Sequence, residues 1–169
     1  SEMCIRDSRS NINEKTITVN LEEETKRVLS SLKNEIQNLN ATVLYDFNEV
    51  KELFAIKSFI YSIFYNLTSN SLKYTKKGVA PLITIKSERL RNGILITFSD
   101  NGLGIDLVKN REKLFKLYSR LHKGIDGKGL GLYIVKSQVL LLKGTIEIES
   151  KLGEGTTFKI LFNFDDESA

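Results

Sequence analysis

Apolar residues recur at helical spacing in three stretches of this chain. The first follows Asn20, which should cap a helix because acids fill the next turn; its apolar stripe is Val28, Leu29, Leu32, Ile36 and Leu39. The second runs over Ile56–Thr75, where Ile60, Ile63, Phe64 and Leu67 share one face. A third helix is expected over Leu130–Lys143, where Gly144 would stop it, and one or two short helices over Asp106–Lys116.

Shorter stretches alternate β-branched and polar residues, and each predicts a strand. These stretches are Thr16–Asn20, Thr42–Asp46, Leu82–Arg91, Ile94–Ser99, Thr145–Ser150 and Thr156–Asn163. Asn92-Gly93 predicts a hairpin with a type I′ turn, which needs positive φ at both residues. Phe47–Ala55 is expected to be a connection, and Gly78 to be the left-handed cap that ends the Ile56–Thr75 helix.

Hairpins and helices interleave here without a regular βαβ repeat, which predicts an α+β fold. We expect helices on one face of a mixed, mostly antiparallel sheet. The sequence shows no linker and no internal repeat, so residues 14–165 are expected to form one domain, with residues 1–13 and 166–169 as tails. No window of about 18 apolar residues suggests a membrane span.

Composition narrows the functional classes. The net charge of +4 among 169 residues suits solubility or a phosphate-bearing ligand, and we expect neither nucleic-acid binding nor membrane contact by this chain. Cys4 is the single cysteine, so no internal disulfide can form and a cytoplasmic location is expected. The single histidine, His122, argues against a histidine-based zinc site and against a Ser-His-Asp triad.

A polar stripe runs along the Ile56–Thr75 helix. Asn66, Asn70, Lys73 and Tyr74 stand at offsets that place them on one face. A helix edge buried against a neighbour would explain the stripe equally well. As chemistry, the asparagine oxygen suits Mg²⁺, the lysine suits a phosphate, and the tyrosine offers a flat surface for a base.

Two glycine motifs lie downstream of the stripe. Asp100-x-Gly102-x-Gly104 follows a strand directly and could be a tight turn, or an acceptor for the amino group of adenine beside a backbone that approaches the ligand. The run Gly127-Lys128-Gly129-Leu130-Gly131-Leu132 opens a helix. This run could be a flexible loop, or an anion site at a helix N-terminus, but it matches neither a Rossmann fingerprint nor a Walker A motif.

A last motif, Gly153-x-Gly155-Thr156-Thr157-Phe158, reads most simply as a hairpin turn. Taken in order, however, the motifs closely resemble the ATP-binding catalytic domain of two-component sensor histidine kinases. Asn66–Tyr74 resembles that family's asparagine box, Leu114–Arg120 its phenylalanine box, and the three glycine motifs its glycine boxes. The resemblance covers roughly residues 16–164 and implies a two-layer α/β sandwich of the Bergerat type.

The resemblance also implies ligands and roles. The cofactors would be ATP and Mg²⁺, with Asn70 holding the metal, Asn66 and Lys73 on the phosphate side, and Asp100, supported by Thr156, reading adenine. Residues 119–129 would form a lid, from which Arg120 could reach the γ-phosphate. Further nucleotide contacts would come from Tyr74, Gly102, Gly104, Ile105, Tyr118, Gly127, Lys128, Gly129, Leu130, Gly131 and Leu132.

The branch of the superfamily is suggested by Asn66. In members that hydrolyse ATP a glutamate usually stands at this position, and an amide cannot act as a general base. The resemblance therefore implies phosphoryl transfer to a histidine on a helical hairpin upstream in a longer parent protein, which could be membrane-anchored. It also implies a response regulator receiver domain as a further partner. A hydrolysing ATPase and a non-catalytic, nucleotide-gated binding module remain the alternatives.

Overall fold

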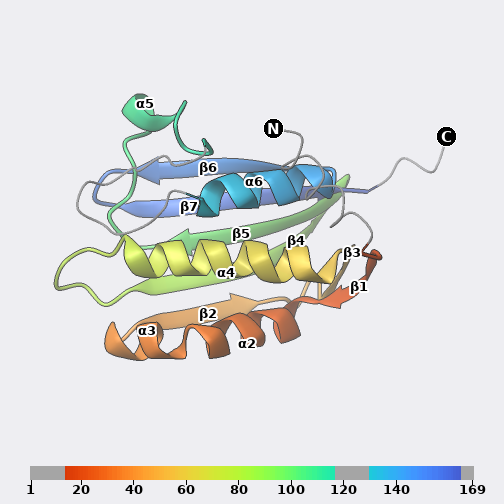
Figure 1. The fold of residues 1–169 in the computed structure, drawn as a ribbon, viewed down its shortest axis with the longest axis horizontal. Coiled ribbons are helices and arrows are strands. Elements are labelled where there is room, and N and C mark those ends of the chain that lie inside the picture. Colours follow the sequence, from red (N-terminus) through yellow and green to blue (C-terminus); the bar gives the residue numbers. More distant parts are fainter. Residues whose placement is uncertain (1–13, 117–129, 165–169) are drawn as a thin grey trace, which may run out of the picture.

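The protein, seen in a computed structural model that describes residues 14–116 and 130–164, has two layers (Figure 1). One layer is a five-stranded sheet in which β2 is parallel to β4 and all other neighbours are antiparallel. In sheet order its strands are β2 (Thr42–Asp46), β4 (Leu82–Leu90), β5 (Gly93–Asp100), β7 (Gly155–Asn163) and β6 (Gly144–Lys151). The predicted α+β fold with a mostly antiparallel sheet is confirmed.

The second layer consists of helices on one face of the sheet (Figure 1). Its long members are α2 (Leu21–Ser31), α4 (Lys57–Lys73) and α6 (Gly131–Leu141), and its short one is α3 (Lys33–Asn38). The short helix α5 (Leu107–Asn110) stands apart from this layer, above β6 in Figure 1. A separate antiparallel ribbon of β1 (Ile17–Asn20) and β3 (Glu52–Ala55) leads into α2 and α4. In the described part of the chain, no helix combines the length and apolarity needed to cross a membrane.

The core lies between the two layers. Alternate residues of β5, namely Ile94, Ile96 and Phe98, are buried against the helices, as the period of a strand requires. Phe64 of α4 meets Phe98 edge to face, with ring centroids 5.0 Å apart. This packing holds α4, which carries the polar stripe, directly over the centre of the sheet.

Two expectations about the first helices and their connection are wrong. Residues 52–55 form β3, which pairs with β1, and its pattern was missed because Leu53, Phe54 and Ala55 are all apolar and show no alternation. The predicted N-cap at Asn20 is confirmed, since its Oδ1 accepts the Glu23 N–H at 3.0 Å. The helix it begins is interrupted at Leu32, however, and the expected core residue Leu39 is exposed.

The turns also differ from expectation. The β4–β5 hairpin is present, but Arg91 and Asn92 form its turn without positive φ, and Gly93 lies in β5. Gly93 is needed there because a Cβ would lie 2.3 Å from the Phe162 carbonyl oxygen of β7. Helix α4 ends at Lys73, so Gly78, although left-handed at φ 77°, does not cap it.

The end of α6 also differs from expectation, because Gly144 was predicted to stop this helix. Lys143 has the positive φ, of 60°, after this helix, whereas Gly144 already belongs to β6. A Cβ on Gly144 would lie 2.8 Å from the Leu161 carbonyl oxygen of β7. The glycine therefore allows a close approach between strands, and the chain reverses at the residue before it.

Candidate functional site

A pocket with about 380 Å³ of empty space opens where the end of α4, the loop after β5, the start of α6 and β7 meet. Seven residues predicted from the sequence line it, together with two that were not predicted, Ser71 and Phe158. The full lining is Asn70, Ser71, Tyr74, Asp100, Gly104, Ile105, Leu132, Thr156 and Phe158. Residues separated by more than 80 positions in the chain thus share one concave site, the usual setting for a small ligand.

Asp100, the last residue of β5, is held in one orientation by three hydrogen bonds. Its Oδ1 accepts the Gly102 N–H at 2.9 Å and the Thr156 N–H at 3.2 Å. Its Oδ2 accepts the Ser71 hydroxyl at 2.8 Å. Because an ionised carboxylate can only accept, Asp100 presents a fixed acceptor to the pocket.

Ser71 was missed because it follows Asn70 by one position and falls outside the spacing that relates Asn66, Asn70, Lys73 and Tyr74. It is mostly buried, but its hydroxyl joins α4 to the carboxylate of Asp100. A serine directly after the second asparagine was the signal that could have revealed it.

The loop after β5 is hydrogen-bonded on one side to the end of α4 and on the other side to the β6–β7 turn. The Leu103 N–H donates to the Tyr74 carbonyl at 2.8 Å, and the Leu103 carbonyl accepts the Gly153 N–H at 2.7 Å. Gly104 has φ 68°, and a Cβ on it would lie 2.0 Å from the Lys151 carbonyl oxygen. Glycine is therefore required at this position both by the left-handed backbone and by the close approach.

Apolar side chains form the walls of the pocket. Ile105 and Phe158 are both largely buried, and Leu132 adds a half-exposed side chain from α6. Thr156 and Asp100 supply polar atoms at one end. A narrow apolar slot with acceptors at one end suits a flat, partly polar ring such as a nucleobase.

The two asparagines of the stripe face the first residue of α6. The Asn66 Nδ2 donates to the Ser62 carbonyl at 2.8 Å, so the Oδ1 of Asn66 is turned away from its own helix. A Cβ built on Gly131 would lie 3.2 Å from that Oδ1 and 3.6 Å from both amide atoms of Asn70. Within residues 14–116 and 130–164 the Asn70 amide has no hydrogen-bond partner, so its oxygen is available to a ligand.

Lys73 is exposed at the end of α4 and does not line the pocket. Tyr74 lines it, but as the C-cap residue it lies beyond the helix on which the stripe was predicted. Gly102 stands behind the pocket, where a Cβ would meet the Tyr74 carbonyl oxygen at 2.3 Å. Helix α6 begins at Gly131 after Leu130, which offers no side-chain cap, so nothing from Leu130 covers the N-terminal N–H groups.

Several predicted residues lie outside the described part of the chain. These are Tyr118, Arg120, Gly127, Lys128 and Gly129, together with the expected lid at residues 119–129 and His122. Of the predicted phenylalanine box, Leu114 is buried and Phe115 half-buried, with the Lys136 ammonium 5.0 Å from the centre of its ring. This contact joins the box to α6.

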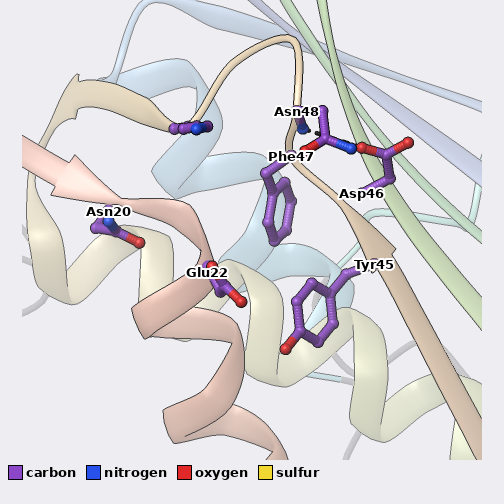
Figure 2. Close-up of a pocket in the computed structure, with 7 residues that line it drawn as sticks. Asn20, Glu22, Tyr45, Asp46, Phe47 and Asn48 are labelled. Atoms are coloured by element: carbon purple, nitrogen blue, oxygen red, sulfur yellow. Dashed lines mark hydrogen bonds between the residues drawn. The ribbon is translucent and has the colours of Figure 1, made fainter.

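A second pocket, of about 530 Å³, lies at the start of α2 (Figure 2). It is lined by Asn20, Glu22, Tyr45, Asp46, Phe47, Asn48 and Lys51, none of which belongs to a predicted motif. Several of these groups have local structural roles: Asn20 caps α2, and the Asp46 carboxylate accepts the Asn48 N–H at 2.9 Å. The pocket around Asp100 is therefore the stronger candidate for a ligand site.

The described residues contain no group of three or more His, Cys, Asp and Glu side chains that could hold a metal ion by themselves. A divalent cation in this site would need the amide oxygens and a ligand's own phosphates. Mg²⁺ is commonly bound in this manner, with few protein ligands and several waters. The Asn70 amide lines the pocket and has no hydrogen-bond partner among the described residues, which suits such a role.

Comparison with known proteins places these features in a family. Residues 55–166 match the family described as histidine kinase-, DNA gyrase B-, and HSP90-like ATPase. The chain is 33% identical over 140 residues to cyanobacterial phytochrome A of Nostoc sp., covering 82% of this chain and 18% of that protein. It is 35% identical over 112 residues to the sensor protein RprX of Bacteroides fragilis, covering 64% of this chain and 21% of that protein.

The fold is also similar to that of solved structures. The catalytic domain of the histidine kinase ThkA superposes with a TM-score of 0.74 at 21% identity, covering 88% of this chain and 95% of that domain. The chain spans about a fifth of the length of the two relatives named above. It thus corresponds to one part of those longer proteins.

Proposed function

Since the chain belongs to the histidine kinase-, DNA gyrase B- and HSP90-like ATPase family and its relatives are sensor histidine kinases, we propose that it is the ATP·Mg²⁺-binding catalytic domain of such a kinase. In this proposal it transfers the γ-phosphate of ATP to a histidine on a dimerisation hairpin of the parent protein. The observation that carries the proposal is the fixed acceptor Asp100 at the end of an apolar slot, with the Asn70 amide beside it.

Adenine would occupy the slot between Ile105, Leu132 and Phe158. Its exocyclic amino group would donate to Asp100, whose carboxylate is already oriented by Ser71 and by two backbone N–H groups. Preorganised acceptors of this kind cost no reorganisation when the ligand binds. Thr156 would add a second polar contact beside Asp100.

The triphosphate would extend toward the two asparagines and the first turn of α6. Asn70 would hold Mg²⁺, which would neutralise phosphate charge during transfer. Asn66 would present its Oδ1, because its Nδ2 is engaged by Ser62, and Lys73 would supply positive charge nearby. Leu130 gives the N-terminus of α6 no side-chain cap, and a helix N-terminus favours an anion in front of it.

Asn66 bears on the choice between transfer and hydrolysis. Its amide cannot take a proton from water, and its Nδ2 is already committed to Ser62. Catalysis would therefore depend on positioning and charge neutralisation of the phosphate, which suits transfer to a side chain. A hydrolysing ATPase and a nucleotide-gated binding module remain the competing functions.

The test is to incubate the chain with ATP, Mg²⁺ and a separately produced kinase hairpin that carries the acceptor histidine. Acid-labile, base-stable phosphate on the hairpin would support the proposal. ATP binding without phosphohistidine would contradict it and favour the binding module, and phosphate release without any acceptor would favour the ATPase. A hairpin with the acceptor histidine replaced by alanine serves as the control.

Two variants test the assigned roles. Asn70→Ala should abolish Mg²⁺-dependent ATP binding while the fold remains, and unchanged affinity in calorimetry would contradict the metal assignment. Asp100→Asn should reduce the preference for ATP over GTP, because the amide adds a donor where only an acceptor stands.

The receiver domain of a response regulator as partner and a cytoplasmic location belong to the same proposal.

A further inference from the structure

Ser150 of β6 does not line the pocket, yet its hydroxyl makes three hydrogen bonds, two of them to residues that do, Ile105 and Thr156. Its Oγ accepts the Ile105 N–H at 2.7 Å and donates to the Gly155 carbonyl at 2.8 Å. It also lies 2.9 Å from the Thr156 Oγ1. The hydroxyl therefore joins the loop after β5 to the start of β7, behind the apolar slot.

The protons of these groups can be assigned by counting. A hydroxyl has one proton and can accept two hydrogen bonds. The Gly155 carbonyl can only accept, so the Ser150 proton is used there, and the backbone N–H of Ile105 can only donate. In the contact between the two hydroxyls, Thr156 must therefore be the donor and Ser150 the acceptor. The lone pairs of the Thr156 Oγ1 then remain able to accept a hydrogen bond from another group.

The same count applies at Ser71, whose proton is used by the Asp100 carboxylate. Three oxygens that border this end of the pocket, those of Ser71, Asp100 and Thr156, are consequently left as acceptors. A ligand N–H would be stabilised here. A ligand carbonyl at the same position would face lone pairs on every side and would lose its hydrogen bonds to water.

We propose that Ser150 is a positioning residue that determines base specificity by holding the Thr156 hydroxyl as an acceptor. This inference rests on the proposed function, because it assumes that the pocket receives the base of a nucleoside triphosphate. With the Thr156 proton engaged, the pocket selects a 6-amino purine over a 6-oxo purine. Without Ser150 the Thr156 hydroxyl is free to rotate and can donate to a 6-oxo group.

The experiment measures Mg²⁺-dependent binding of ATP and of inosine triphosphate (ITP) to the purified chain by calorimetry. These two nucleotides differ at the 6-position, where ATP bears an amino group and ITP a carbonyl, and at the adjacent N1, which accepts a hydrogen bond in ATP and carries a proton in ITP. For Ser150→Ala we expect the ratio of ATP affinity to ITP affinity to fall about tenfold, since one contact changes from acceptor to donor. A residue with a merely structural role would weaken both nucleotides equally and leave the ratio unchanged.

Two further variants sharpen the comparison. Ser99→Ala is the matched control, because Ser99 and Thr157 form an equivalent hydroxyl pair at 2.9 Å on the opposite face of the same sheet; its affinity ratio should equal that of the wild type. In a Thr156→Val background, Ser150→Ala should have no further effect on the ratio, because the hydroxyl through which it acts is gone.

Each outcome is decisive. If the wild type prefers ATP and Ser150→Ala leaves the ratio unchanged, this inference is wrong and the proposed function stands. If the wild type binds neither nucleotide, the proposed function itself fails. If Ser150→Ala does not fold, Thr156→Val decides: it should weaken ATP several-fold and leave ITP unchanged, and an equal loss for both nucleotides would overturn the inference.

Discussion

Replacing Gly131 with alanine should separate folding from nucleotide binding. Gly131 is the first residue of α6 and does not have a positive φ, so alanine can adopt its backbone conformation without strain. Such a replacement typically raises the free energy of unfolding by about 0.4–1 kcal/mol, because alanine loses less conformational freedom on folding. The new methyl group would lie 3.2 Å from the Asn66 Oδ1, a contact that a shift of a few tenths of an ångström relieves.

The side chains that would have to shift are those of Asn66 and Asn70, which are proposed to contact the phosphates and the metal ion. The methyl group would also lie 3.6 Å from the Asn70 amide and would occupy the gap between α4 and α6. Losing one hydrogen bond to a charged group costs about 1.5–3 kcal/mol. At about 1.4 kcal/mol per tenfold, the affinity for ATP·Mg²⁺ should fall roughly 10- to 100-fold.

The assay pairs urea unfolding with calorimetric titration of ATP in the presence of Mg²⁺. Gly153→Ala is the matched control with the opposite pattern: its φ is 84° and nothing lies within 4 Å of the added Cβ. It should therefore lose about 1–2 kcal/mol of stability from backbone strain alone and keep its affinity. Unchanged ATP affinity in Gly131→Ala, or a loss of stability above about 1 kcal/mol, would refute the reasoning.

Three further changes test the fold that holds the site. Gly104→Ala should destabilise the protein by at least about 3 kcal/mol in urea unfolding, because both a positive φ and a Cβ 2.0 Å from the Lys151 carbonyl oxygen oppose it; near-wild-type stability would contradict this. Glu24→Ala should cost about 1–3 kcal/mol by the same measurement, since it removes a buried carboxylate from its two basic neighbours. Phe64→Leu should lower stability by about 0.5–2 kcal/mol through the lost edge contact with Phe98, and a Tm equal to that of the wild type would argue against it.

Much of the fold follows from local pattern. The helix that begins after Asn20, the long helix with its buried face, and the two hairpins all appear where the sequence places them. These elements are long or carry strong local signals, such as a cap or an alternation of apolar residues. The β3 strand was missed because four residues with three adjacent apolar side chains carry no such signal.

The turn predictions failed for a common reason. Gly93 was interpreted as a turn residue and Gly144 as a helix stop, but both glycines lie in strands, where a side chain would collide with a neighbouring backbone. A glycine can be required either because its φ is positive or because another backbone approaches it closely, and the sequence does not distinguish these two reasons. The identity of the neighbouring strand, which is set by the sheet order, decides between them.

The amino-acid sequence by itself indicated seven of the nine residues that line the Asp100 pocket, because Asn70, Asp100 and the glycines stand in ordered motifs with helical or turn spacing. The tertiary structure decided how those groups are presented. Ser71 and Ser150 became visible through hydrogen bonds that span 29 and 45 residues of the chain, to Asp100 and Ile105. Such contacts depend on which elements pack side by side, and that packing fixes where each hydroxyl proton lies.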